Sequence, residues 1–219
     1  MKFAYSTQRG ERCLFYNQIF CASGDSCASS RSWWKEMFLD ARQFGFVNDL
    51  EAAWREIRDE YLALPEDSFE PWVQREMYGE GWSVYGLYAF GQRIDAALRA
   101  CPRTAAALVR VPGLTTAGFS RLAPGTHIQP HIGWVRTVFR SHLGLIVPDG
   151  CEMRVGSETR SWREGKCLIF DDTAEHEAWN CAGHTRVVLL FDFLRPGVSS
   201  EMRDELPAEV RDFVRGQKK

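Results

Sequence analysis

The chain has 219 residues, of which 45% are hydrophobic and 26% charged, and its formal net charge is −2 at pH 7. These values predict one soluble globular domain with its own core and exclude a strongly basic nucleic-acid-binding protein. No apolar run approaches the roughly 20 residues of a membrane-spanning helix, and the first residues lack the order of a signal peptide. We therefore expect a cytoplasmic protein without a membrane segment.

The seven cysteines are odd in number and scattered, and none follows a Cys-x-x-Cys spacing. In a reducing compartment this pattern favours free thiols. A zinc knuckle formed by Cys21 and Cys27 is a weak alternative.

Changes of pattern along the chain divide the single domain (residues 1–219) into four parts. We expect an N-terminal segment of unclear role, a mostly helical support, a β-rich core that carries the site, and a C-terminal helix, over residues 1–37, 38–114, 115–197 and 198–219. In the first part, Trp33 and Trp34 either pack against the core or contribute to specificity.

The helical part contains one clear periodic stretch. Apolar residues recur at steps of three and four over 47–64, which predicts an amphipathic helix that packs on the core. Asn48 or Asp49 would cap this helix and Pro65 would end it. An aromatic strand is expected next, followed by two further helices, over residues 81–91, 94–98 and 104–111.

From Thr115 onward the pattern changes to short apolar strands separated by turns that are rich in glycine and proline. The expected strands are GFSRLAP, THIQPHIG, TVFRSHLGLIVP, CEMRVG, ETRSW, KCLIFDD, EHEAWN and TRVVLLFDFL. Many short strands at this spacing predict an antiparallel sandwich or barrel. The fold class is therefore mainly β with flanking helices.

All five histidines lie between residues 120 and 186, and His131 and His176 are the best metal candidates. Imidazole suits iron, copper and zinc, and residues far apart in sequence meet near the open end of a barrel. A single histidine is more often a hydrogen-bonded structural residue. The metal hypothesis therefore rests on the combination with nearby arginines.

Arg186 shares one face of its strand with Val188 and Leu190, because alternate residues of a strand point the same way. An inward arginine among apolar residues is costly unless it meets an anion, and its planar fork suits a carboxylate. Arg140 and His142 share a strand face in the same manner. These residues together predict a pocket for a small dicarboxylate. The alternative is pairing with a structural Asp or Glu, which is a stronger rival for Arg140 than for Arg186.

The expected carboxylate ligand is missing. Mononuclear iron oxygenases usually bind the metal with two histidines and one carboxylate, which normally lies two residues after the first histidine. Here that position is Gly133. Either two histidines and water hold the metal, or the site is of another kind. Asp172 is placed to hydrogen-bond a metal-bound water without ligating the metal itself.

The segments FSRLAPGTHIQPHIG, FRSHLGLIVPDGCEMRVGSETRSWREGKCLIFDDTAEHEAWN and RVVLLFDFLRP resemble the aspartyl/asparaginyl β-hydroxylases, a family of iron(II)- and 2-oxoglutarate-dependent oxygenases. The resemblance covers roughly residues 38–197 and implies a double-stranded β-helix of the jelly-roll, cupin-like type. It also implies iron bound by His131 and His176 alone, with Gly133 expected and Asp172 close to the metal.

The resemblance further implies which residues contact 2-oxoglutarate. These are Ser120, Arg140, His142 and Arg186, with Arg186 holding the distal carboxylate and Arg140 or His142 the end near the metal. Near the cosubstrate, Leu122 stands where the animal enzymes have methionine, and Tyr88 where they have tryptophan. Both keep an apolar wall.

The implied reaction is O2-dependent hydroxylation of an unactivated C–H bond, with 2-oxoglutarate converted to succinate and CO2. We expect the β-carbon of an Asp/Asn-type or related amino acid, whether free, carrier-bound or in a peptide. Family members also act on lipid acyl chains, which the absence of a membrane segment counts against. The alternatives are a two-histidine iron halogenase and a non-catalytic barrel that binds an organic acid.

Overall fold

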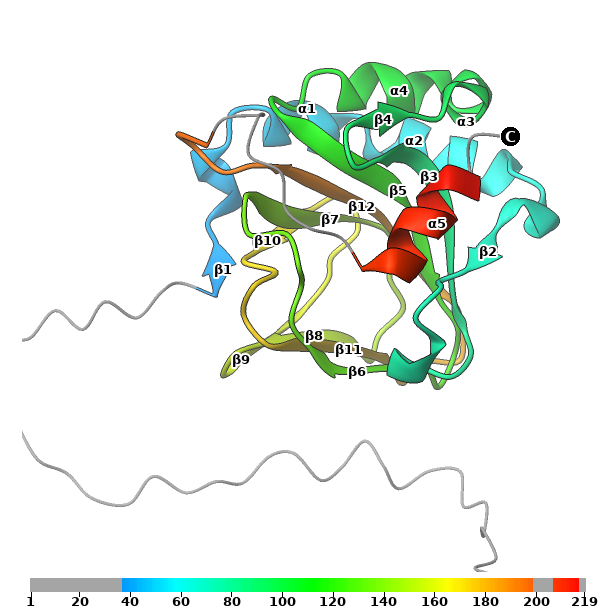
Figure 1. Cartoon of the computed structure of the whole chain (residues 1–219), viewed down its shortest axis with the longest axis vertical. Coiled ribbons are helices and arrows are strands. Elements are labelled where there is room, and N and C mark those ends of the chain that lie inside the picture. Colours follow the sequence, from blue (N-terminus) through cyan, green and yellow to red (C-terminus); the bar gives the residue numbers. More distant parts are fainter. Residues whose placement is uncertain (1–36, 199–206, 217–219) are drawn as a thin grey trace, which may run out of the picture. The chain divides into compact units, whose positions relative to one another are not determined.

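Two antiparallel sheets face each other and form the body of the protein (Figure 1). The computed structural model describes residues 37–198 and 207–216, which belong to one compact unit. The larger sheet has the order β1-β10-β7-β12-β5-β3-β2, with β4 paired to β3, and the smaller sheet has the order β6-β11-β8-β9. This arrangement confirms the predicted double-stranded β-helix.

The strands are β1 (Phe38–Leu39), β2 (Glu70–Pro71), β3 (Trp82–Ala89), β4 (Gln92–Arg93), β5 (Leu114–Leu122), β6 (His127–His131), β7 (Val138–Ile146), β8 (Cys151–Val155), β9 (Glu158–Ser161), β10 (Cys167–Phe170), β11 (His176–Asn180) and β12 (Arg186–Leu194). Every strand expected after residue 114 is present. The strands β1, β2 and β4 were not expected, because two residues are too few to show a period.

Helices cover the outer face of the larger sheet (Figure 1). The described helices are α1 (Val47–Ala52), α2 (Trp54–Ala63), α3 (Asp95–Ala100), α4 (Pro102–Leu108) and α5 (Ala208–Gly216), of which the first four form this cover. Short 3-10 turns are η1 (Ala41–Gln43), η2 (Glu66–Ser68) and η3 (Arg75–Met77). Of these, α5 lies instead beside the gap between the two sheets. None of the described helices is long and apolar enough to span a membrane.

The stretch expected as a single helix over 47–64 is two helices, α1 and α2, that meet at Ala53. The predicted capping was wrong, because Phe46 occupies the N-cap position and makes no side-chain cap bond. Asp49 instead accepts a 3.0 Å hydrogen bond from Arg110 beyond α4. The predicted apolar stripe is nevertheless correct, since Val47, Leu50 and Ile57 are buried in the core.

The central strand β12 separates two apolar clusters. Val187, Leu189 and Phe191 pack in the cluster beneath the helices, whereas Val188 and Leu190 pack in the cluster between the two sheets. Arg186 shares the alternation of Val188 and Leu190, so it faces the interior between the sheets, as the sequence predicted.

Three cysteines, Cys101, Cys151 and Cys167, are free thiols as expected. The expectation was wrong for Cys181, which is disulfide-bonded. Cys181 is exposed, whereas Cys101 and Cys151 are buried, so its sulfur is the more accessible one for pairing. Trp33 and Trp34, and the knuckle residues Cys21 and Cys27, lie outside the described residues.

Candidate metal and anion site

His131 and His176 lie opposite each other on the neighbouring strands β6 and β11. Their ring centroids are 4.1 Å apart. In each ring Nδ1 lies 2.8 Å from a backbone carbonyl oxygen, that of Gln129 for His131 and that of Ala174 for His176. A carbonyl only accepts, so each Nδ1 carries the proton and each Nε2 keeps its lone pair. The pair is therefore oriented as metal-binding histidines usually are.

Both imidazoles are held in the neutral form that a metal requires. Burial, and for His131 also the proximity of His176, lowers the pKa of His131 to about 4. Burial likewise lowers the pKa of His176 to about 4. Within the described residues, no group of three or more His, Cys, Asp and Glu side chains is arranged around a metal position. The two neutral rings, each with its Nε2 lone pair kept, fit a metal held by two protein nitrogens.

The place of the missing carboxylate is filled by Asp172, which lies in the turn between β10 and β11. A Cβ at Gly133 would overlap the side-chain carboxylate of Asp172 and lie 2.9 Å from the Asp172 backbone oxygen. The amide of Gly133 also donates to that backbone oxygen at 2.8 Å. Asp172 is 1% exposed, and its Oδ1 lies 3.2 Å from Nε2 of His176. Glycine at position 133 is therefore needed to admit the aspartate.

Arg140 is held by two aspartates. It donates through Nε and Nη2 to Asp192 at 2.8 and 2.9 Å, and through Nη1 to Asp172 at 2.7 Å. Asp192 is 1% exposed, so this fork is buried on its inner side. For Arg140 the alternative weighed from the sequence, pairing with structural acids, is thus present in the structure. Arg140 orients Asp172 beside His176.

Arg186 is 2% exposed, and no carboxylate in the described part of the chain lies within ion-pair distance of it. Its guanidinium lies 4.6 Å from the centre of the Trp162 ring, its Nη1 makes a long 3.4 Å bond to the Ser120 carbonyl, and its Nε has no partner. Burial lowers the pKa of Arg186 to about 10, so it remains cationic at neutral pH. A buried unpaired cation of this kind calls for an anionic ligand.

His142 and Ser120 each have a hydrogen-bond donor that lies in the same interior between the sheets as Arg186. Trp162 Nε1 donates to Nδ1 of His142 at 3.1 Å, which places the proton of this neutral ring on Nε2, an atom that is buried without a partner. Trp82 Nε1 donates to Oγ of Ser120 at 3.1 Å, so the Ser120 hydroxyl proton is left to donate. The β-register aligns Ser120 with Val188 and His142 with Leu190 on the inward face of β12.

One aromatic side chain connects the two halves of the site. Phe170 lies 5.2 Å from the His142 ring and 5.5 Å from the His176 ring, between centroids. Leu122 is fully buried, pairs in register with Arg186 and forms part of the apolar wall. Tyr88 lies farther out, where Arg93 stacks over its ring at 5.9 Å, and it lines the mouth of the cavity.

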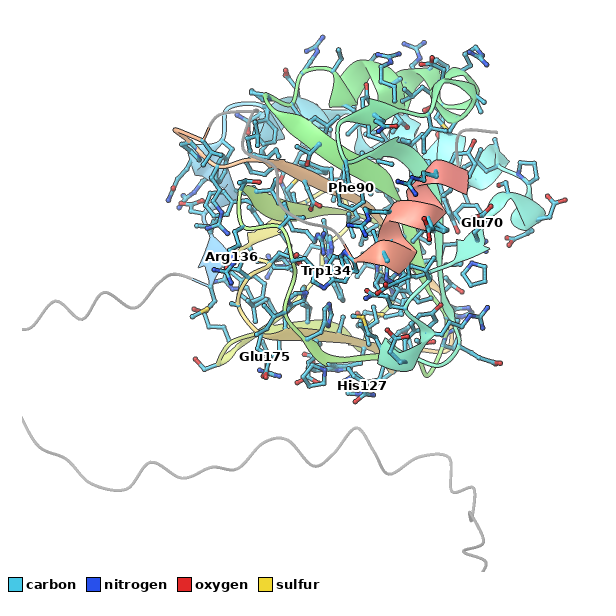
Figure 2. The ribbon with its side chains drawn as sticks, in the orientation of Figure 1. Glu70, Phe90, His127, Trp134, Arg136 and Glu175 are labelled. Atoms are coloured by element: carbon cyan, nitrogen blue, oxygen red, sulfur yellow. The ribbon has the colours of Figure 1, made fainter. Side chains whose placement is uncertain are left out.

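A cavity contains His131 and is lined on one side by Phe213 of α5; Figure 2 labels two of its other lining residues, Phe90 and Trp134. Its polar lining residues include His131, Arg140, Asp172 and Ser120. Its wall is mostly apolar and contains Trp72, Met77, Trp82, Val84, Tyr85, Tyr88, Phe90, Ile94, Trp134, Val135, Leu190 and Phe213.

Sequence reasoning missed Trp162, Trp82 and Asp192. The available signal for Trp162 was a single large apolar residue in the otherwise polar stretch ETRSWREGK. Nothing in the sequence distinguishes Asp192. His127, to which no role was given, lies on the outer face of the smaller sheet (Figure 2), with Nε2 2.7 Å from Glu177.

These features define a double-stranded β-helix protein with a histidine pair and a buried arginine that lacks a carboxylate partner among the described residues, both between its sheets. Solved structures with a related fold include a 2-oxoglutarate–Fe(II) oxygenase family protein from Burkholderia pseudomallei, with a TM-score of 0.47 and 15% identity over 71% of this chain and 94% of that one. A sequence model of the aspartyl/asparaginyl beta-hydroxylase family matches residues 51–196. The chain belongs to this family.

Two curated relatives illustrate the range of the family. The chain is 49% identical over 118 residues to the ornithine lipid ester-linked acyl 2-hydroxylase of Rhizobium tropici, a match that covers 52% of this chain and 42% of the relative. It is 35% identical over 188 residues to human aspartyl/asparaginyl beta-hydroxylase, which covers 82% of this chain and 24% of that protein. The chain thus matches less than half the length of either relative.

Proposed function

We propose that the protein is an iron(II)- and 2-oxoglutarate-dependent hydroxylase. The observation that carries this proposal is Arg186, a buried cation with no carboxylate partner among the described residues, which faces the same interior between the sheets as a histidine pair whose Nε2 atoms keep their lone pairs. A ligand with one carboxylate at Arg186 and a chelating end at the histidines would satisfy both. The family match supports the same reading.

Each residue has a stated task in this proposal. His131 and His176 hold the iron through Nε2, while the Nε2–H of His142 and the hydroxyl of Ser120 join Arg186 at the distal carboxylate. Arg140 orients Asp172 toward the metal position. When bound, iron(II) and 2-oxoglutarate supply the oxidising power that converts a substrate C–H to C–OH with O2. The apolar wall, including Leu122, excludes water from this interior.

Two substrate classes remain. The expectation from the sequence is an Asp/Asn-type amino acid, free, carrier-bound or in a peptide. The apolar lining of the mouth, and the 49% identity to a relative named for a lipid acyl substrate, favour an acyl chain as a second candidate. Succinate released in the presence of acyl substrates but not of Asp- or Asn-containing peptides would support the second, and the reverse result the first. A chlorinated product would indicate the halogenase alternative.

The cosubstrate assignment is tested by ligand-induced thermal stabilisation. With iron(II) and without oxygen, 2-oxoglutarate should raise the melting temperature of the protein, because a ligand that binds only the folded state stabilises it. Arg186→Met should lose this increase, whereas the ligand-free variant should be as stable as the parent or more so, since an unpaired buried charge is removed.

Arg121→Met is the matched control, because Arg121 lies on the adjacent strand β5 but pairs with Glu66 away from the cavity. It should retain the shift caused by 2-oxoglutarate. An undiminished shift in Arg186→Met would refute the assignment.

A further inference from the structure

Phe90 has a φ of +48°, and it is the one residue other than glycine with a positive φ in the described ranges 37–198 and 207–216. Positive φ places Cβ against the following carbonyl group, so bulky residues avoid it. Such strain persists only where the surroundings enforce it, and it often marks a functional position.

The strain is imposed by a two-residue hairpin. Ala89 pairs with Gln92 where β3 turns into β4, which leaves Phe90 and Gly91 as the central residues. Their φ values are +48° and +81°, the signs of a type I′ turn, whose preferred sequence is Asn-Gly. Glycine meets this preference at the second position. A phenylalanine at the first position costs about 1–2 kcal/mol relative to a residue that tolerates the conformation.

Core packing does not explain the choice of phenylalanine. Phe90 belongs to neither apolar cluster, although its neighbours Tyr88 and Ile94 both pack against the one beneath the helices. Its half-buried side chain instead lines the cavity that contains His131. The loop residue Trp134 lines the same cavity, and Figure 2 labels both residues.

We propose that Phe90 is a specificity-determining residue, held in a strained turn so that its ring forms an apolar contact for the substrate at the mouth. The inference rests on the proposed function and selects, of its two substrate classes, the one with an alkyl or acyl chain. A purely polar amino-acid substrate would gain nothing from this ring, and an asparagine would then serve the turn better.

The test combines stability with binding in Phe90→Asn. Relief of about 1–2 kcal/mol of turn strain should raise the melting temperature by about 2–8 °C in a chain of this size. Loss of the ring should weaken binding of dodecanoate by about tenfold, measured by calorimetry on protein loaded with iron(II) and 2-oxoglutarate without oxygen. Phe90→Leu, which keeps an apolar side chain, should bind dodecanoate within about threefold of the parent.

Val109→Asn is the matched control, because Val109 is 70% exposed and is not among the residues that line the cavity. It should leave dodecanoate binding unchanged. A lower melting temperature for Phe90→Asn, or dodecanoate binding equal to that of the parent, would overturn the proposal. If dodecanoate binding depends on Phe90 but no succinate ever forms, the proposed hydroxylase function fails while this binding role stands.

Discussion

Substitution of Gly133 by alanine tests how the site manages without a carboxylate ligand at that position. The added Cβ would overlap the Asp172 carboxylate, which is 1% exposed and bonded to Arg140 at 2.7 Å. Relief requires Asp172 to leave Arg140 and His176. Breaking a buried ion pair costs about 3–5 kcal/mol, so we expect unfolding free energy to fall by about 3 kcal/mol and the melting temperature by roughly 6–12 °C.

The assay is thermal unfolding of the metal-free protein, with iron affinity measured in parallel. Gly183→Ala is the control, because a Cβ there meets no atom within 4 Å and its φ is not positive. It should change stability by less than about 0.5 kcal/mol. Gly133→Ala with the stability and iron affinity of Gly183→Ala would refute the close packing of Asp172 against residue 133.

The close contact between residue 133 and Asp172 also predicts what a carboxylate introduced at position 133 would do. Gly133→Asp alone should be destabilised, because two carboxylates would compete for one space. Combining it with Asp172→Ala should recover part of the loss, and the coupling in this double-mutant cycle should exceed about 1 kcal/mol. If the two substitutions changed the free energy of unfolding additively, the predicted competition between residues 133 and 172 would be wrong.

Two other predictions concern buried groups away from the histidines. Asp192→Asn should lower the free energy of unfolding by about 3 kcal/mol, because Arg140 loses one of its two buried carboxylate partners and the only one that it contacts through two nitrogens in the described part of the chain. Denaturant unfolding measures this, and a change below about 0.5 kcal/mol would contradict it. Burial raises the pKa of the Cys101 thiol from 9.0 to about 12. Between pH 9.0 and about 12 the thiol of the unfolded chain loses its proton, whereas that of the native protein keeps it. The free energy of unfolding should therefore fall as the pH rises through this range. In Cys101→Ala it should fall less steeply.

The sequence predicted the strands well because their alternation and turn residues are local signals. Arg186 was also predictable, since its position on an apolar strand fixed its direction and left it in need of an anion. The break at Ala53 was not predictable, because residues 47–64 keep one apolar stripe across it.

Contacts between distant strands account for most of what the sequence did not predict. The clamp of Asp192 on Arg140 depends on the register between β7 and β12, which no local pattern encodes. The approach of Asp172 to Gly133 depends on how the segments after β10 and β6 meet, although these strands belong to different sheets. The turn at Phe90 was missed for a different reason. Phenylalanine is untypical of a type I′ turn, and a residue that violates a local preference is often one that serves function.

The most direct test of the central claim is the visible absorption spectrum of metal-free protein mixed with iron(II) and 2-oxoglutarate in the absence of oxygen. A weak charge-transfer band that requires all three components, and that is absent in His131→Ala and His176→Ala, would mean that the keto acid chelates iron at this histidine pair. With iron binding confirmed independently, the absence of a band in the parent protein, or an unchanged band in either histidine variant, would contradict the account.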